Sequence, residues 1–233
     1  MKKNICHLIP AAGKASRLSG IPKFLLPLPE ESNLLKHHLN LSNDIKEINS
    51  VKIATNTTFA PILNNQINIS KNRKIQGINL MNTKTMNKTL MNLRGHDADS
   101  HLLTMPDTYI SDNSLIKKMV RLFKEDSEVD VILGIWNVRN EQRHKVGQCK
   151  ISGNYVTKVV DKNFKVKYQY LWGTVLFKNS LWKYIKPNDP HIGYSFPAAI
   201  NNNLKIRYVK SDGNYYDCGT IDEYWKLIKD IQN

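Results

Sequence analysis

The fold of this chain is best predicted from one stretch near its start, Ile9-Pro10-Ala11-Ala12-Gly13-Lys14-Ala15-Ser16-Arg17-Leu18-Ser19-Gly20-Ile21-Pro22-Lys23-Phe24, which follows a short apolar run. Small residues such as Ala12 and Gly13 let a backbone approach a ligand and turn its N–H groups toward an anion. Arg17 and Lys23 add positive charge. The stretch predicts a phosphate-binding loop after a strand, although by itself it also fits an ordinary basic turn.

Two common phosphate-binding motifs are excluded for this loop. A Walker loop has a glycine five residues before its Gly-Lys and a Ser or Thr directly after it, whereas here Leu8 precedes Gly13-Lys14 and Ala15 follows. A dinucleotide-binding fingerprint needs three spaced glycines, of which only Gly13 is in place.

Apolar periodicity outward from this loop predicts alternating strands and helices in the first half of the chain. The predicted strands cover 4–10, 50–55, 75–81, 101–105 and 129–138. The predicted helices cover 34–41 with Ser32 as N-cap, 59–63, 85–93, and 115–123 with Asp112 as cap. This alternation favours a parallel sheet with helices on both faces.

The second half of the chain has a different pattern. Strands predicted over 147–151, 155–160 and 168–177 are separated by turn residues such as Ser152-Gly153-Asn154, so we expect them to be antiparallel. Helices over 180–185 and 196–201, a strand over 205–209 and a helix over 221–231 follow. No internal repeat or linker divides the chain, and we expect one domain over 1–233.

Composition limits the kinds of partner that the protein can have. The 233 residues include 34 Lys and Arg against 20 Asp and Glu, a net charge of +14 that attracts polyanions. The basic residues are scattered and are mostly lysines, a pattern that a biased codon composition also produces. Because no stripe of arginines with interleaved aromatic residues is present, we do not expect a dedicated nucleic-acid surface.

Cysteine usage and hydropathy favour a cytoplasmic location. Cys6, Cys149 and Cys218 lie far apart and form no C-x-x-C pair, which indicates neither a disulfide framework nor a zinc site. The apolar run at 5–10 is too short for a signal peptide, and no segment has the length of a membrane span.

Two aspartates each follow a strand-like run, Asp107 after 102–106 and Asp217 after 215–216. Ligands of open parallel sheets bind at the carboxyl ends of the strands, so these carboxylates beside a cationic loop could hold Mg²⁺ on a phosphate. Each aspartate taken alone also fits a helix cap or a turn.

Taken together and in order, these segments resemble the nucleotide-sugar pyrophosphorylase, or sugar-phosphate nucleotidyltransferase, family. The opening motif of the family resembles residues 11–18 with Pro22-Lys23, its mid-chain metal motif resembles 103–107, and its late Asp-x-Gly-Thr motif resembles 217–220. Gly147, 156–162 and 172–177 are similar to further family segments, so the resemblance covers nearly the whole chain.

The resemblance implies a fold, a reaction and a set of site residues. The fold would be a Rossmann-like (GT-A-like) α/β fold with a mixed, mostly parallel sheet flanked by helices and an antiparallel subregion on the acceptor side. The reaction would transfer a nucleotidyl group from a nucleoside triphosphate to a sugar phosphate, or a related polyol or alcohol phosphate, and release pyrophosphate. By the resemblance, Asp107 and Asp217 would hold Mg²⁺. Arg17 would stabilise the leaving pyrophosphate, and Lys23 would stabilise charge at the α-phosphorus. Lys162 would hold the acceptor phosphate, and the backbone at Ala11, Ala12 and Gly13 would face the nucleotide.

Several positions depart from the family pattern. Ala15 replaces a usual glycine, and Asp161 and Asn163 stand where Glu and Pro are usual. The interval from Arg17 to Lys23 resembles that of compact members that use polyols or small alcohols. The usual base-reading segment is replaced by 83–97, so the choice of base stays open.

Two other functions compete with nucleotidyl transfer. A glycosyltransferase that uses a nucleotide sugar would have the same fold, but its usual Asp-x-Asp motif is absent at Asp107-Thr108-Tyr109. The interpretation as a nucleic-acid-binding protein is supported only by the net charge. A homodimer is the assembly that we expect if the protein oligomerises, and no membrane partner is expected.

Histidines and tryptophans are expected to serve mainly the packing of the protein. His37, His38 and His101 fall in helix or strand patterns and are predicted to be solvated or hydrogen-bonded rather than to be ligands. The four tryptophans are predicted to pack in the core or at its rim, and Trp172, beside Gly173, could line the acceptor pocket.

Overall fold

The computed structural model describes residues 4–29, 33–70, 72, 74–94, 98–163 and 165–232. One mixed sheet contains β1 (Ile5–Ala11), β2 (Ile48–Thr55), β3 (Ile75–Leu80), β4 (Ser100–Thr104), β6 (Val131–Asn137), β7 (Gly147–Ser152), β8 (Tyr155–Asp161), β9 (Tyr170–Lys178) and β10 (Ile206–Lys210). Their order across the sheet is β3-β2-β1-β4-β9-β6-β10-β8-β7. Strands β8 and β9 run opposite to the other seven, as the mostly parallel prediction requires.

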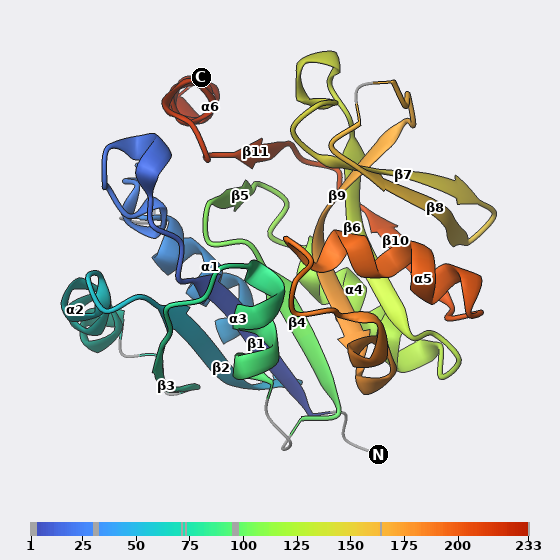
Figure 1. Cartoon of the computed structure of the whole chain (residues 1–233), viewed down its shortest axis with the longest axis horizontal. Coiled ribbons are helices and arrows are strands. Elements are labelled where there is room, and N and C mark those ends of the chain that lie inside the picture. Colours follow the sequence, from blue (N-terminus) through green and yellow to red (C-terminus); the bar gives the residue numbers. More distant parts are fainter. Residues whose placement is uncertain are drawn as a thin grey trace.

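Helices cover both faces of this sheet (Figure 1). They are α1 (Leu34–Asn43), α2 (Ala60–Ser70), α3 (Met86–Leu93), α4 (Leu115–Glu125), α5 (Ser195–Asn201) and α6 (Ile221–Gln232). The apolar residues of α3 and α5 pack in one core cluster with Leu8 of β1, whereas those of α1, α2 and α4 pack on the opposite face with Ile5 and Ile9. This split follows from the two-residue period of β1, which sends alternate side chains to opposite faces.

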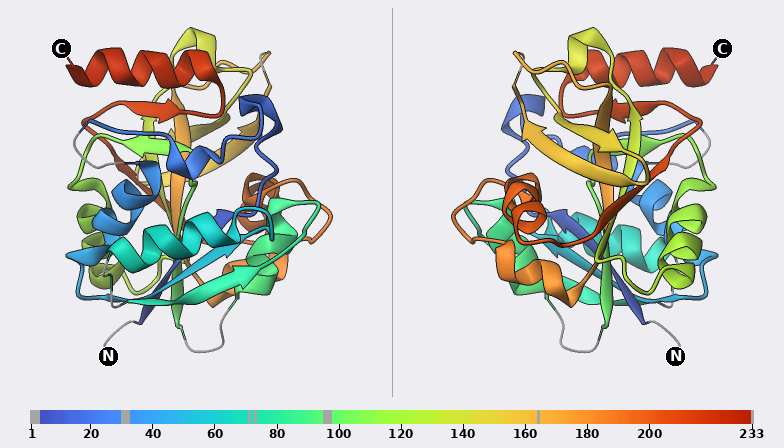
Figure 2. Two further views of the ribbon diagram at one scale, coloured as in Figure 1. Left: turned by 90° about the vertical axis from the view of Figure 1, so that its left-hand side faces the viewer. Right: turned by 90° about the vertical axis from the view of Figure 1, so that its right-hand side faces the viewer.

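Two three-residue strands, β5 (Thr108–Ile110) and β11 (Tyr215–Asp217), form a separate small sheet that the sequence did not reveal. They pair antiparallel, with Asp217 opposite Thr108 and Tyr215 opposite Ile110. Helix α6 lies over β11 (Figure 2). Leu18 and Leu26 of the opening loop pack into the same cluster as Tyr216 and Leu227, so the loop, the small sheet and α6 form one unit.

Some local predictions need correction. The helix predicted over 180–185 is the 3₁₀ helix η4 (Asn179–Tyr184), which begins and ends one residue earlier. Helix α4 has Ser114 as its N-cap, and Asp112 instead accepts a hydrogen bond from the backbone N–H of Ser114 at 2.9 Å. The predicted cap Ser32 lies outside the described residues; Asn33 caps α1 by accepting from the N–H of Lys36.

The three cysteines are free and buried. None of the helices in the described ranges is both long and apolar enough to cross a membrane. The prediction of one domain over 1–233 stays a prediction, although the central sheet contains strands from both halves of the chain.

Candidate active site

The opening loop leaves β1 at Ala11 and bends twice through left-handed backbone. Ala15 has φ +54° and Ser19 has φ +49°, and between them lies the 3₁₀ helix η1 (Ser16–Leu18). The carbonyl of Ala15 accepts from the N–H groups of Leu18 and Gly20, which closes the turn. The left-handed region favours glycine, so alanine holds the turn here at a cost of about 1 kcal/mol. The side chain of Arg17 lies outside the described part of the chain.

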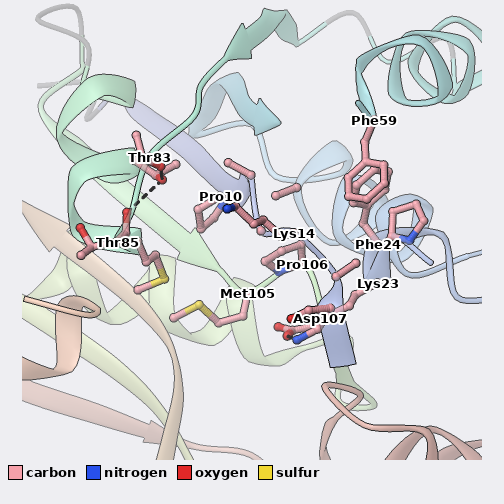
Figure 3. Close-up of a pocket in the computed structure, with 18 of the residues that line it drawn as sticks. Pro10, Lys14, Lys23, Phe24, Phe59, Thr83, Thr85, Met105, Pro106 and Asp107 are labelled. Carbon is pink, nitrogen blue, oxygen red and sulfur yellow. Dashed lines mark hydrogen bonds and ion pairs between the residues drawn. The ribbon is translucent and has the colours of Figure 1, made fainter. Parts of the chain in front are cut away.

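A first cavity of about 320 Å³ opens over this loop (Figure 3). The predicted residues Ala11, Ala12, Gly13, Lys23 and Asp107 all contribute to its wall. The wall also contains Phe59, Met105 and five residues of the 83–97 segment: Thr83, Lys84, Thr85, Met86 and Thr89. Thr83 and Thr85 lie on one side of this cavity, and Lys23 and Asp107 lie on the other (Figure 3).

Lys23 and Asp107 form an ion pair across 84 residues of sequence. Lys23 lies at the start of the 3₁₀ helix η2 (Lys23–Leu25), and its Nζ donates to Oδ2 of Asp107 at 2.7 Å. The side chains are 17% and 22% exposed, so the pair is partly shielded from water yet reachable from the cavity. A phosphate that enters here meets a cation whose position is already set.

A second cavity of about 570 Å³ lies beside the first and contains Asp217 and Lys162 in its wall. The two cavities share Met86, Met105 and Asp107. The four other predicted residues are thus not scattered: Lys23 lines the first cavity, Asp217 and Lys162 line the second, and Asp107 lines both.

The small sheet brings the two aspartates together. Beyond the β5–β11 pairing, the N–H of Cys218 donates to the carbonyl of Asp107 at 2.8 Å. Oδ1 of Asp217 accepts from the N–H of Gly219 at 3.0 Å. Burial, followed by the negative charges of Asp217 and Asp107, raises the pKa of Tyr215 well above its ordinary value, so both carboxylates act on the same phenol.

The donor set at this point suits a magnesium ion. Among the described residues, no group of three or more His, Cys, Asp or Glu side chains is arranged to hold a metal. Mg²⁺, however, is usually bound through one or two carboxylates together with substrate phosphates and water. Asp107, where the two cavities meet, and Asp217 in the second cavity are two hard oxygen donors, so they fit this ion.

The wall of the second cavity also contains a partly buried pair that the sequence did not predict. Nε2 of His191 and Oδ2 of Asp161 lie 2.8 Å apart, and their side chains are 16% and 9% exposed. Nδ1 of His191 accepts from the N–H of Gly193 at 3.2 Å, so the ring proton lies on Nε2 and is donated to Asp161. No signal in the sequence links positions 161 and 191. Next to this pair, Lys162 is exposed and has φ +46°, and its N–H donates to the carbonyl of Val146.

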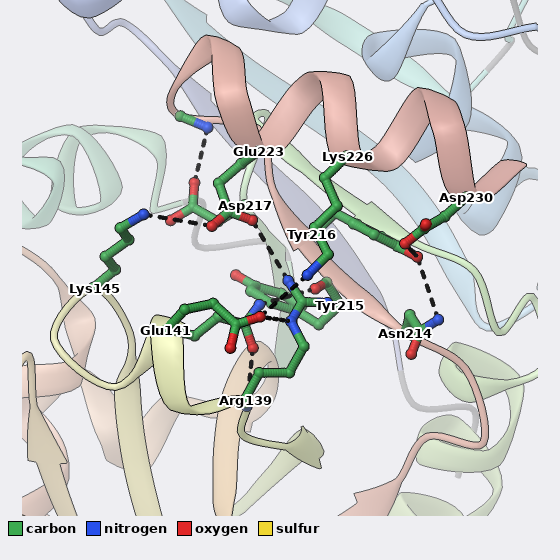
Figure 4. Close-up of polar contacts among 12 residues, drawn as sticks. Arg139, Glu141, Lys145, Asn214, Tyr215, Tyr216, Asp217, Glu223, Lys226 and Asp230 are labelled. Carbon is green, nitrogen blue, oxygen red and sulfur yellow. Dashed lines mark hydrogen bonds and ion pairs between the residues drawn. The ribbon is translucent and has the colours of Figure 1, made fainter.

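A network of ion pairs ties α6 to the segment before β7 (Figure 4). Glu223 is buried and lies 3.4 Å from Lys145 and 3.5 Å from Arg139. Arg139 also pairs with Glu141, which pairs in turn with Lys226 of α6. Glu223 and Lys145 line the second cavity, so this network holds one of its walls.

Two of the three histidines considered in the sequence, His37 and His101, are hydrogen-bonded. Nε2 of His37 accepts from the N–H of Ile110 in β5, and Nδ1 of His101 accepts from the indole of Trp182. His38 is fully buried beside them, and burial lowers its pKa well below the ordinary value. None of these three lines either cavity.

Comparison with solved structures identifies chains of the same fold. A protein from Bacillus anthracis assigned as a glucose-1-phosphate thymidylyltransferase, in complex with sucrose, superposes with a TM-score of 0.81 at 17% identity, over 98% of this chain and 96% of that one. A UDP-glucose pyrophosphorylase complexed with UDP-glucose gives 0.79 at 17% identity, over 99% and 98%. An inositol-1-phosphate CTP transferase from T. maritima gives 0.75 at 13% identity, over 100% and 98%.

A comparison with curated proteins gives no match. The model of the nucleotidyl transferase family, however, matches residues 7–233. This range begins in β1 and includes the opening loop, both aspartates and α6. The chain therefore belongs to the nucleotidyl transferase family.

Proposed function

We propose that this nucleotidyltransferase joins the nucleotidyl group of a nucleoside triphosphate to a sugar phosphate, or to a related polyol phosphate, and releases pyrophosphate. The observation that carries the proposal is the meeting of two cavities at Asp107, with Asp217 held beside it by the small sheet. A reaction between two phosphates needs two neighbouring sites whose common edge carries the charge-neutralising groups.

The first cavity suits the triphosphate. Its floor is the backbone of 10–16, which has small side chains and can present N–H groups to phosphate oxygens. Lys14 and Lys23 add positive charge at this floor. Thr83 and Thr85 supply polar groups at the opposite side, where the base would lie.

The second cavity suits the phosphorylated acceptor. It is larger, it contains the cationic side chains of Lys145 and Lys162, and it reaches Asp107 and Asp217. The solved structures of this fold include proteins named for glucose 1-phosphate and inositol 1-phosphate, which supports a sugar or cyclitol phosphate as acceptor.

In the proposed reaction, an oxygen of the acceptor phosphate attacks the α-phosphorus of the triphosphate. The new bond forms as the bond from the α-phosphorus to the bridging β-oxygen breaks, and pyrophosphate leaves with that oxygen. Lys23 donates to a non-bridging oxygen of the α-phosphate, where negative charge accumulates, and Arg17 holds the pyrophosphate. Lys162 positions the acceptor phosphate. These groups act by positioning and charge stabilisation, and no covalent intermediate with the protein is required.

Asp107 and Asp217 would hold Mg²⁺, which supplies neutralisation of the phosphate charges when it is bound. The ion pair with Lys23 keeps the Asp107 carboxylate at the edge between the two cavities. Asp217 is kept there by the N–H of Gly219 and by the pairing of β11 with β5.

A pyrophosphate-release assay tests this function. Wild-type protein is incubated with each common nucleoside triphosphate and with glucose 1-phosphate or inositol 1-phosphate, with Mg²⁺ or with EDTA. We expect release that needs Mg²⁺ and both substrates, and that falls about 100-fold or more in Asp107→Asn and Asp217→Asn. Asp212→Asn is the matched control, because this carboxylate is 83% exposed and lines neither cavity.

The same assay separates the glycosyltransferase alternative. A glycosyltransferase would consume a nucleotide sugar and release a nucleoside diphosphate, without forming pyrophosphate from any triphosphate. Such a result, or pyrophosphate release that both aspartate variants leave unchanged, would contradict the proposed reaction.

A further inference from the structure

His37 of α1 is a buried residue that bonds the small sheet between the two aspartates, and the proposed reaction has not used it. Its Nε2 accepts from the backbone N–H of Ile110 in β5 at 3.2 Å. His37 is 1% exposed and Ile110 is fully buried, so this N–H is bonded by the imidazole and not by solvent. Because Nε2 accepts, the ring proton lies on Nδ1.

The imidazole supports β5 where the small sheet offers no strand. Strand β11 is the neighbour of β5 in this sheet, but the N–H of Ile110 is directed to α1, which packs against β5. The ring of His37 also lies 4.5 Å from the ring of Tyr109, between centroids, with 30° between their planes. A pair of short strands is marginally stable by itself, and a buried N–H without an acceptor destabilises it further. The position of β5 therefore depends on His37.

Asp107 stands directly before β5, so the position of this strand sets the position of the carboxylate. The backbone N–H and the hydroxyl of Thr108 both donate to the carbonyl of Met105, at 3.1 and 2.9 Å, and close the turn that contains Asp107. The carbonyl of Asp107 accepts from the N–H of Cys218, the residue after Asp217. Mg²⁺ demands nearly ideal ligand geometry, so a shift of β5 would weaken an ion held by both carboxylates.

We infer that His37 is a positioning residue of the magnesium site: its imidazole fixes β5 and thereby keeps Asp107 where it meets the same ion as Asp217. His37 lines neither of the two cavities that the described residues form, so it acts only through the strand. The inference rests on the proposed function for the role of the two aspartates as ligands of Mg²⁺. It adds a residue of α1 whose effect is on metal affinity and not on the binding of the acceptor.

Nuclear magnetic resonance tests the contact and its effect on the metal without turnover. In isotope-labelled wild-type protein, scalar coupling across the N–H···N bond should connect the amide of Ile110 with Nε2 of His37. Titration with Mg²⁺, followed at the amides of Thr108 and Gly219 beside the two aspartates, gives the dissociation constant of the ion. We expect this constant to rise about 10-fold in His37→Leu and to stay within about threefold of the wild-type value in His37→Gln, whose Oε1 can replace Nε2 as acceptor.

His101→Leu is the matched control. His101 is also a buried histidine that accepts one N–H, but its donor is the indole of Trp182 in η4, outside the small sheet. This variant loses a comparable buried hydrogen bond, so any effect of reduced stability alone appears in it as well. Its Mg²⁺ dissociation constant should stay within about twofold of the wild-type value, and thermal melting checks that each variant is folded.

Kinetics give a second measurement. In the pyrophosphate-release assay, His37→Leu should need about 10-fold more Mg²⁺ for the half-maximal rate, while KM for the acceptor should stay within about twofold. His37→Gln should restore the wild-type requirement to within about threefold. If His37→Leu does not fold, His37→Asn replaces it, because its amide oxygen is one methylene closer to the backbone than that of glutamine and does not reach Ile110.

The outcomes separate this inference from the proposed function. An unchanged Mg²⁺ constant in His37→Leu, an equal rise in His101→Leu, or a wild-type protein without the coupling to Ile110 overturns the inference and leaves the proposed reaction standing. A raised constant in His37→Leu that His37→Gln restores, in a protein that releases no pyrophosphate, supports the inference and overturns the proposed reaction. If Mg²⁺ shifts neither amide in the wild-type protein, the inference fails whether or not the enzyme turns over.

Discussion

Acid should destabilise this protein well before its carboxylates are protonated, because buried histidines must stay neutral in the folded state. His7 of β1 is fully buried, and burial, with a smaller effect of the Lys74 charge, lowers its pKa to about 3. Burial, then the charges of Arg94 and Lys52, lowers the pKa of His101 on β4 to about 4. Both rings are neutral in the folded protein at pH 5.

The local contacts explain why these rings resist a second proton. Nε2 of His7 bonds Oγ1 of Thr104 at 2.8 Å, and Nδ1 has no partner in the described structure. Nδ1 of His101 accepts from the indole of Trp182 at 3.4 Å, so a proton at Nδ1 would set two donors against each other.

The sign and size of the effect follow from the linkage between proton binding and folding. Below the ordinary histidine pKa of 6.5, the unfolded chain binds a proton at each position and the folded protein does not, so stability falls as pH falls. Between pH 7 and pH 5, each histidine lowers the free energy of unfolding by about 2 kcal/mol, and the two together lower it by about 4 kcal/mol. His38, whose pKa is also lowered, acts in the same direction.

Urea denaturation at pH 7 and pH 5 measures this change directly. We expect the wild-type free energy of unfolding to be at least about 4 kcal/mol lower at pH 5, and His101→Phe to reduce that difference by about 2 kcal/mol. His7→Asn should reduce it by a similar amount. A wild-type difference below about 1 kcal/mol, or a difference that His101→Phe leaves intact, would refute the reasoning.

Three further substitutions test the site and its supports. Gly147→Ala would place Cβ 2.1 Å from Nε1 of Trp172, so we expect a free energy of unfolding lower by about 1–3 kcal/mol and a higher acceptor KM, measured by urea denaturation and pyrophosphate release. Arg17→Ala should lower turnover about 100-fold or more while the circular dichroism spectrum stays that of the wild type, and near-normal turnover would remove Arg17 from the mechanism. Glu223→Ala removes the buried partner of Arg139, so urea denaturation should show a loss of about 1–3 kcal/mol, and an unchanged midpoint would mean that the network does not stabilise α6.

Most strands and helices could be predicted because their signals are local. The apolar run predicted over 129–138 forms β6 at Val131–Asn137, and the pattern predicted over 115–123 forms α4 at Leu115–Glu125. Periods of two and 3.6 residues arise within a few consecutive residues, so no distant part of the chain is needed to read them. The predicted cap of α4 was wrong by two residues: the helix begins after Ser114, although the side chain of Asp112 bonds the N–H of Ser114.

Some site residues could also be predicted from local sequence, whereas others depend on contacts between distant parts of the chain. Small and basic residues in the opening loop, and aspartates after apolar runs, are visible in the sequence, and the structure places Lys23, Asp107 and Asp217 along connected cavities. His191 is different, because its place in the site comes from its contact with Asp161, which lies 30 positions away in the sequence. No local pattern marks such a pair.

The sequence by itself determined the α/β alternation, and it predicted a phosphate-binding loop after the first strand and two aspartates that meet this loop. The tertiary structure decided how they meet. The strands β5 and β11 have only three residues each, too few for a recognisable period, and they are joined by pairing between positions 108–110 and 215–217. Such a contact forms only when the whole intervening chain has folded, because it joins segments that are more than 100 residues apart. This pairing places Asp217 beside Asp107. It thereby brings the second cavity next to the first, whose wall includes residues of the basic loop from Ile9 to Phe24.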